Sequence, residues 1–257
     1  MLYPIGIQNF GKLREGGYLY IDKTEKIYSL VSKGGYYFLS RPRRFGKSLL
    51  VSTMEAYFEG KRELFEGLAM DRLEKDWSRY PVLHLDLSGK AYLTPDDLDI
   101  TLDQHLSQWE SEYKVQPRYS KADARFKDVI SSAYEMTGSQ VAILIDEYDK
   151  PIIDNLDNPE LQEYYRSTLQ GFYSVMKAKD ECIRFGFLTG VTKIGKLSVF
   201  SGLNNLRDIS MLSRYSDICG ISDDDLHEYF PESVRELAEA NGLTEDECYR
   251  KLADMYD

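Results

Sequence analysis

Short apolar runs alternate with longer stretches of helical periodicity along most of the chain. The runs are rich in aliphatic and aromatic residues and are bounded by Gly, Pro, Ser or Asp, which is typical of strands. They are too short for buried helices. We therefore expect buried strands at residues 36–39, 82–87, 141–145 and 184–188.

Amphipathic helices are predicted between these strands. Residues 47–58 carry apolar side chains at the three- and four-residue spacing that gathers them on one face of a helix. Further helices are expected at residues 96–112, 121–136 and 160–179. Strands alternating with helices predict an α/β fold with a mostly parallel sheet that is buried on both faces.

The end of the chain has a different character. Ser222 followed by Asp225, and Thr244 followed by Glu247, have the spacing of capping boxes that begin helices. We expect a core over residues 1–221 and a small helical lid over residues 222–257. The last residues contain no Gly or Pro stop signal, so the lid is expected to be truncated and to continue in a longer protein.

Composition and charge restrict the partners. The net charge is −11 and the pI is near 4.9, so the body of the protein repels nucleic-acid backbones and anionic membranes. Binding of phosphate then requires a local basic cluster, and residues 41–47 supply one. The three cysteines lie far apart, which fits a reducing compartment. We find neither a signal peptide nor a long apolar span, and expect a cytoplasmic protein without a membrane partner.

A strand, a loop, Gly46-Lys47-Ser48 and a helix follow one another in the order of a phosphate-binding loop. Such a loop uses inward-pointing amides, a Lys that reaches the β- and γ-phosphates and a hydroxyl that binds Mg²⁺. The start of the helix adds the positive end of its dipole. The residues expected to bind nucleotide here are Arg41, Arg43, Arg44, Phe45, Gly46, Lys47, Ser48 and Leu49.

Arg41 stands where the pattern G-x-x-x-x-G-K-[ST] has its first glycine. A left-handed backbone at a non-glycine residue costs about 1–2 kcal/mol. A charge-assisted hydrogen bond from an arginine to phosphate could offset this with about 1.5–3 kcal/mol. Pro42 removes one amide donor but stiffens the turn. The alternative is a solvated turn before a helix.

The strand at 141–145 ends in Asp146-Glu147, which predicts a metal and water site. Asp146 would reach Mg²⁺ through a coordinated water while Ser48 binds the ion directly. Glu147 would polarise the attacking water. The alternative is a buried strand that merely ends in acids. Thr189 and Thr192 follow at the end of the strand at 184–188. Either would sense the γ-phosphate, or would simply bond to the backbone.

These motifs resemble the bacterial AAA-ATPase-like domain family, whose members often carry a C-terminal PD-(D/E)XK nuclease-like domain. The similarity covers nearly the whole chain. It implies a three-layer P-loop NTPase core of the additional-strand, catalytic-glutamate type with a helical lid. The chain itself lacks a nuclease triad. The segments that carry the resemblance are residues 5–10, 20–24, 39–48, 145–151, 188–191, 200–206 and 208–210.

By analogy with related ATPases, the N-terminal segment contacts the adenine or forms an edge strand; the candidates are Tyr20, Asp22, Lys23 and Thr24. A polar loop is expected near the nucleotide or at a subunit interface; it contains Asn204, Asn205, Arg207 and Asp208. Arg207 or Arg214 would act as an arginine finger or lid sensor, or form a surface ion pair.

The leading hypothesis is a slow Mg²⁺-dependent ATPase in which Lys47, Asp146 and Glu147 are catalytic. Its cofactors would be ATP and Mg²⁺, and it would couple nucleotide state to the lid or to a missing C-terminal nuclease-like domain. The alternative is a nucleotide-dependent switch or scaffold without significant turnover. A third hypothesis is a DNA-processing ATPase. The partners left open are a second copy of the chain and nucleic acid reached through the missing domain.

Overall fold

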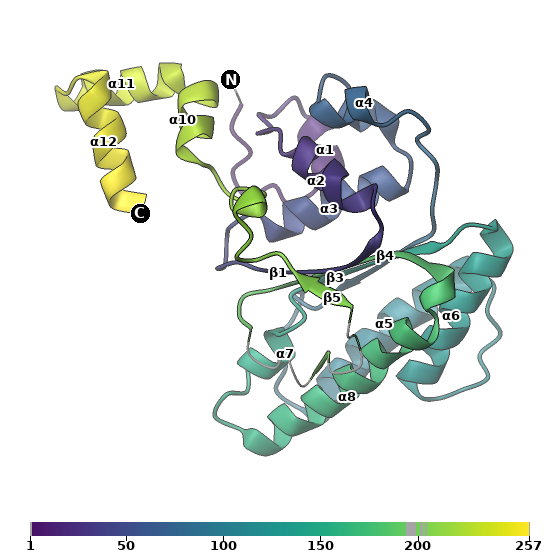
Figure 1. Ribbon diagram of the computed structural model, residues 1–257. Helices are drawn as coiled ribbons and strands as arrows, with labels where there is room; N and C mark the ends of the chain where they lie inside the picture. Colours follow the sequence, from purple (N-terminus) through teal and green to yellow (C-terminus); the bar gives the residue numbers. More distant parts are fainter. Residues whose placement is uncertain (1, 194–198, 201–202, 204, 257) are drawn as a thin grey trace.

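The computed structural model describes residues 2–193, 199–200, 203 and 205–256. Its centre is a parallel sheet with the strand order β2-β3-β4-β1-β5 (Figure 1). Four strands match the sequence prediction, and β4 lies between β1 and β3, as expected for an additional-strand core. The strands are β1 (Gly35–Ser40), β2 (Val82–Asp86), β3 (Val141–Asp146), β4 (Ile183–Gly190) and β5 (Leu206–Asp208).

Helices cover both faces of the sheet, which confirms the predicted α/β layers (Figure 1). One face carries α1 (Phe10–Glu15), α2 (Thr24–Val31), α3 (Lys47–Phe58), η1 (Arg62–Phe65) and α4 (Ala69–Leu73). The other carries α5 (Pro95–Glu112), α6 (Ala122–Thr137), α7 (Lys150–Ile153), α8 (Pro159–Ala178) and η2 (Asp180–Cys182). The predicted helices α3, α5, α6 and α8 begin and end within a residue or two of their expected bounds.

The buried central strand β3 explains why its sequence is apolar throughout. Ile143 and Ile145 pack in the hydrophobic cluster formed with α5, α6 and α8. Ala142 and Leu144 pack in the cluster formed with α1–α4. Because both faces are covered, every residue of β3 is buried and a continuous apolar run replaces alternation.

Two segments differ from the sequence expectations. Residues 20–24 do not form an edge strand; they lead into α2, which begins at Thr24. Residues 206–208 do not remain a polar loop; they form the edge strand β5, with Tyr36 opposite Leu206 and Phe38 opposite Asp208. Both elements are short and obtain their stability from the sheet and core beside them, so local patterning carries little signal.

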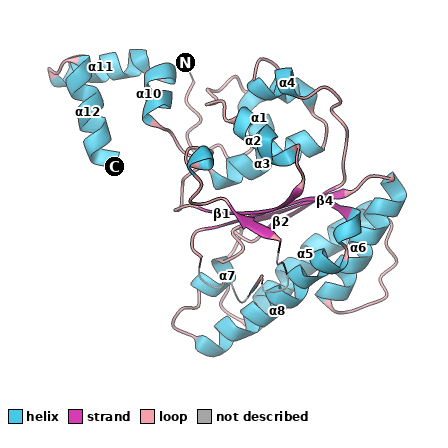
Figure 2. Ribbon diagram, in the orientation of Figure 1, coloured by secondary structure: helices cyan, strands magenta, loops and turns pink. Residues whose placement is uncertain are grey.

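The C-terminal helical unit consists of α10 (Asp223–Tyr229), α11 (Pro231–Asn241) and α12 (Glu245–Tyr256), and follows η3 (Ser213–Tyr215). It stands to one side of the core, near the N-terminus (Figures 1 and 2). A small cluster of its own holds the unit together, centred on Val234, Ala238 and Cys248.

Both predicted capping boxes form in this unit. The Ser222 amide donates to Asp225 at 2.7 Å and the Asp225 amide donates to the Ser222 hydroxyl at 3.2 Å. The Thr244 and Glu247 pair makes the same two bonds at 2.9 and 3.3 Å. In the part of the chain that the structure describes, no helix is long and apolar enough to cross a membrane.

Candidate functional site

The carboxyl ends of β1, β3 and β4 meet at one edge of the sheet. In the register, Leu39 lies opposite Thr189, and Ile145 lies opposite Leu188. In open parallel sheets, ligands bind outside this edge. The phosphate-loop candidate follows β1 and the acid pair ends β3, so the fold brings the two predicted motifs together.

A pocket of about 770 Å³ lies between the loop and the acid pair; we call it the polar pocket. Seven of the predicted residues line it, namely Arg43, Arg44, Gly46, Lys47, Ser48, Leu49 and Glu147. Sequence reasoning missed three polar lining residues, Gln8, Ser88 and Lys150. Gln8 and Lys150 lie within segments quoted for the family resemblance, which was the one available signal.

The start of α3 presents free backbone donors to this pocket. Gly46 is the N-cap, with φ of 81°, and no side chain caps the helix. The first N–H groups of a helix have no partner within the helix and favour anions. The left-handed non-glycine residue of the loop is Arg44, with φ of 67°, and not Arg41 as expected from the glycine pattern. The steric cost therefore falls at a different position from the predicted one.

Lys47 is buried, and its side chain bonds back to its own loop. Its Nζ donates to the carbonyl of Arg41 at 3.1 Å and to that of Pro42 at 3.0 Å. Among the described residues its hydrogen-bond partners are these two neutral carbonyls, which such an ammonium group can exchange for a more strongly attracting anion.

The Arg41 side chain points away from the polar pocket. Its guanidinium donates to the carbonyls of Ser210, Tyr215 and Ser216 at 2.7–3.1 Å and to its own neighbour Ser40 at 3.0 Å. Backbone carbonyls thus occupy both terminal nitrogens of this guanidinium, which was expected to bind phosphate.

The acid pair is organised by Thr189. The Thr189 hydroxyl donates to Asp146 Oδ1, and the amide of Glu147 donates to the same hydroxyl at 3.3 Å. Thr189 is fully buried and does not line the polar pocket among the described residues. In this structure its hydroxyl is bound to the acid pair.

Glu147 has a perturbed environment. Its backbone is left-handed, with φ of 53°, which turns the half-buried side chain into the polar pocket. Burial raises the pKa of the Glu147 carboxyl above its ordinary value, and the neighbouring Asp146 carboxylate adds to the rise, while Lys47 and Arg43 oppose it. A carboxylate with a raised pKa is a stronger proton acceptor.

Asp149, which the sequence analysis did not single out, joins the acid pair to the end of β4. Its buried carboxylate accepts from the Thr192 amide at 2.7 Å, from the Thr192 hydroxyl at 3.0 Å and from the Val191 amide at 3.1 Å. Gly190 makes this approach possible, because a Cβ there would lie 2.8 Å from Asp149 Oδ1 and 2.5 Å from the Tyr148 ring. The Thr192 hydroxyl is therefore bound to Asp149.

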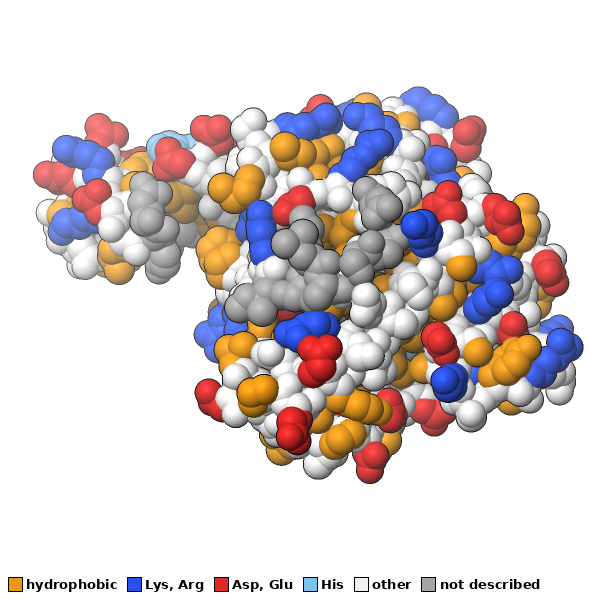
Figure 3. All heavy atoms as spheres, turned by 60° about the horizontal axis from the view of Figure 1, so that its bottom comes forward, with side chains coloured by type: hydrophobic (Ala, Val, Ile, Leu, Met, Phe, Trp, Pro, Cys, Tyr) orange, Lys and Arg blue, Asp and Glu red, His pale blue; other side chains and the backbone are white. Residues whose placement is uncertain are grey.

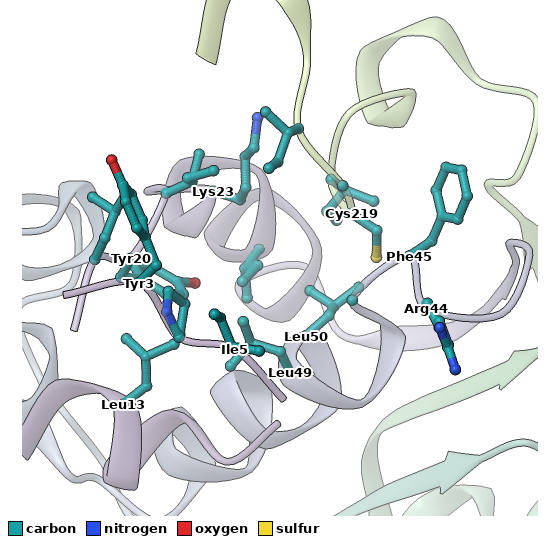
Figure 4. Close-up of a pocket in the computed structure, with 18 of the residues that line it drawn as sticks. Tyr3, Ile5, Leu13, Tyr20, Lys23, Arg44, Phe45, Leu49, Leu50 and Cys219 are labelled. Carbon is teal, nitrogen blue, oxygen red and sulfur yellow. The ribbon is translucent and has the colours of Figure 1, made fainter. Parts of the chain in front are cut away.

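A second pocket, of about 440 Å³, adjoins the polar pocket and is mainly apolar (Figure 4); we call it the apolar pocket. Its walls come from the N-terminal segment, the first turns of α3, residues 218–221 and Phe230 of the C-terminal helical unit. Both pockets share Arg44, Gly46 and Leu49. Figure 4 shows Arg44 and Phe45 leaving the loop in opposite directions, with Phe45 on the side of Cys219.

Two of the four N-terminal candidates line the apolar pocket. They are Tyr20 and Lys23. Asp22 instead accepts from the amides of Thr24 and Ala69 at 2.9 and 2.7 Å. Burial in these walls raises the pKa of the Cys219 thiol to about 12, so the thiol is neutral at physiological pH.

The remaining candidates lie elsewhere. The Arg207 guanidinium lies 6.0 Å from the Tyr37 ring centroid, and that of Arg214 lies 4.6 Å from the Tyr215 ring centroid. Neither arginine is among the described residues that line the two pockets. Asp208 accepts from the Ser210 amide. Asn204 lies outside the described residues.

Comparison with known proteins identified a family and a relative. Residues 4–200 match the model of a family described as predicted AAA-ATPase. A protein of Azotobacter chroococcum mcd 1, described as an uncharacterized protein in the vnfD 5' region, is 44% identical over 247 residues, which are 95% of this chain and 46% of that protein. The chain thus spans about half the length of this relative. The family match includes the loop, the acid pair and Thr189.

Proposed function

Because this chain belongs to the family of predicted AAA-ATPases, we propose that it binds Mg·ATP at the two pockets and hydrolyses it slowly. One observation carries the proposal. Lys47 and Ser48, at the uncapped start of α3, share the polar pocket with Glu147, whose backbone neighbour is the buried Asp146.

The triphosphate would occupy the polar pocket. The amides of residues 43–48 and the Lys47 ammonium supply donors for the phosphate oxygens. Ser48 and Asp146 offer hydroxyl and carboxylate oxygens, the ligand types that Mg²⁺ prefers. The bound ion would neutralise charge on the β- and γ-phosphates. Arg43 and Arg44 add positive charge at the exposed side of the loop.

Glu147 would act as the general base. Its carboxylate takes a proton from the water that attacks the γ-phosphorus, while the bond from that phosphorus to the bridging oxygen breaks and ADP leaves with the oxygen. The raised pKa favours proton uptake. Thr189 would fix the positions of both acids through its bonds to Asp146 and the Glu147 amide.

The adenine would occupy the apolar pocket. A flat aromatic base is suited to its apolar walls, and its size lies within the usual range of ligand pockets. Tyr20, Lys23 and Leu49 would then lie beside the base.

We further propose that residues 1–221 form the ATPase core and residues 222–257 a lid. Phe230 of the lid lines the apolar pocket, and Lys23 lies 2.5 Å from Asp225. The lid therefore touches the residues that would surround the base. Ligand bound there would change the free energy of lid docking.

The test is calorimetry with Mg·ATP combined with a phosphate-release assay on wild type and Glu147→Gln. We expect Glu147→Gln to bind Mg·ATP as wild type does and to lose turnover by about 100-fold or more, the usual contribution of a general base. Equal turnover of the two proteins would remove Glu147 from the chemistry. Absence of binding heat with wild type would refute nucleotide binding.

A switch without significant turnover is the second candidate. The altered loop, with Arg41 in place of the first glycine of the usual pattern, favours it. Wild type that binds Mg·ATP tightly but releases no phosphate, at any protein concentration and with or without DNA, would establish this candidate.

A DNA-processing activity is the third candidate and has less support. The net charge is −11, and the face turned forward in Figure 3 shows acidic and basic side chains interspersed. Phosphate backbones bind to concentrated positive charge. A DNA titration at low salt tests it, and retention of DNA by the chain would revive the candidate.

A further inference from the structure

Arg41 makes contact with three parts of the molecule through three different groups. Its amide donates to the Gly190 carbonyl at the end of β4, at 3.1 Å. Its carbonyl accepts from Lys47 Nζ at 3.1 Å. Its guanidinium donates to carbonyls that lie 169 to 175 positions later in the chain. The residue thus joins the phosphate loop, the β4 end and the segment before the helical unit.

We infer that Arg41 is a positioning residue that transmits the nucleotide state of the loop to segment 210–222 and onward to the C-terminal helical unit. The inference rests on the proposed function, because it assumes a nucleotide in the polar pocket. It assigns to Arg41 a role other than that of a phosphate ligand.

The bonds of the guanidinium fix the start of segment 210–222. One terminal nitrogen, Nη1, donates to the Ser210 carbonyl at 2.7 Å, and the other, Nη2, donates to Tyr215 and Ser216 at 3.1 Å each. The Ser40 amide donates to the Ser210 hydroxyl at 2.9 Å. A planar group with several fixed donors can hold these acceptors together, whereas the single nitrogen of a lysine cannot match the same geometry.

Segment 210–222 continues directly into the walls of the apolar pocket and into the lid. Asp217 follows Ser216 and pairs with Lys23 at 3.4 Å and with Lys26. Residues 218–221 line the apolar pocket. Lys23 also pairs with Asp225 in the first turn of α10. A displacement at Ser216 would therefore reach the base pocket and α10 through adjacent residues.

Nucleotide binding would act first on the carbonyl of Arg41. To reach a phosphate, Lys47 must give up its bonds to the carbonyls of Arg41 and Pro42. That carbonyl and the guanidinium belong to one residue, so a change of loop shape alters the bonds to segment 210–222. A glycine at position 41 would suit the backbone of the loop but would have no side chain to bond to segment 210–222.

The test compares hydrogen exchange in wild type, Arg41→Gly and Arg41→Lys, each with and without a non-hydrolysable Mg·ATP analogue. Arg14→Ala is the matched control, since Arg14 also donates to two backbone carbonyls, those of Leu64 and Glu66, at 2.8 and 2.7 Å. If Arg41→Gly folds poorly, Arg41→Lys still tests the inference.

Without nucleotide, we expect the amides of residues 210–222 to exchange about tenfold faster or more in both Arg41 variants, as the loss of charge-assisted bonds implies. Arg14→Ala should leave this segment at the wild-type rate. With the analogue, wild type should change its exchange at 210–229, whereas the Arg41 variants should bind within about threefold of wild-type affinity and show no such change.

Wild-type exchange in both Arg41 variants, or an unaltered nucleotide response at 210–229, would overturn the inference. So would a large loss of affinity with wild-type exchange in the free protein, which would make Arg41 a phosphate ligand. Wild type that binds no nucleotide would refute the proposed function and the transmission together. Hydrogen exchange of the nucleotide-free proteins would still decide whether the Arg41 guanidinium stabilises segment 210–222.

Discussion

The polar pocket and the apolar pocket differ in how the chain builds them. The charged residues of the polar pocket come from two short segments, 43–47 and 147–150, that each follow a strand; the N-terminal segment and Ser88 complete its lining. The apolar pocket gathers Tyr20, Leu49, Cys219 and Phe230 from four separate segments. The charged groups are therefore concentrated in two segments, while the apolar walls are assembled from several distant parts of the chain. Variants that affect one pocket and spare the other test this division.

The largest effect is expected from Lys47→Ala. The change removes the ammonium that would bind the phosphates, so affinity for both Mg·ATP and inorganic tripolyphosphate should fall by about 100-fold or more, equivalent to two charge-assisted hydrogen bonds. Calorimetry measures both ligands. Lys127→Ala, an exposed lysine on α6, should bind like wild type. Retained affinity in Lys47→Ala would contradict the assignment of the polar pocket.

Cys219→Phe should separate the pockets. The larger side chain fills space in the apolar pocket, and overpacking of this kind costs about 1–3 kcal/mol. Affinity for Mg·ATP should fall about tenfold while affinity for tripolyphosphate stays the same. Cys182→Phe, at a buried cysteine in the other helical layer, controls for loss of folded protein. An equal loss for both ligands would place the base elsewhere.

Lys23→Met should loosen the helical unit. The change keeps the length of the side chain but leaves Asp225 without its cation at a largely buried position. Cleavage by thermolysin within residues 217–222 should accelerate about threefold to tenfold, because local opening becomes easier. Lys26→Met removes a more exposed partner of Asp217 alone and should have the smaller effect. The reverse order would contradict the role given to Lys23.

The smallest effect concerns pH. In the proposed mechanism, turnover requires the Glu147 carboxylate. Burial and the neighbouring Asp146 carboxylate raise the pKa of Glu147, so the rate should fall with decreasing pH at a midpoint above that of an ordinary glutamate. Arg43 opposes the rise, and Arg43→Gln should therefore move the midpoint further upward. Rates at saturating Mg·ATP across the pH range measure both. A midpoint at the ordinary glutamate value, or a downward shift in Arg43→Gln, would contradict the electrostatics.

The sequence was sufficient to predict the strands that are buried on both sides and the helices between them. Val141–Asp146 is apolar because both of its faces are covered, and that pattern does not depend on any other part of the chain. The edge strand β5 has three residues, one side of which is open, so its residues carry no comparable pattern. Its existence follows from β1, with which it pairs.

For the candidate site, residue types were predictable and their partners were not. Lys47, Ser48 and Glu147 line one pocket, as the motifs indicated. Arg41 was expected to turn toward phosphate because its sequence neighbours are basic, yet its acceptors lie on a distant segment. Thr189 bonds to Asp146, and Asp149 bonds to Val191 and Thr192 just after β4; the pairing of β3 with β4 brings these residues together.

The left-handed backbone of Glu147 lowers the stability of the fold at the position where the proposed chemistry needs a carboxylate. Glycine adopts such a φ at no steric cost, and asparagine does so more readily than glutamate. In a directed-evolution experiment that selects for heat resistance alone, glycine and asparagine should accumulate at this position. The proteins that survive the highest temperatures would then be those that lack the proposed general base.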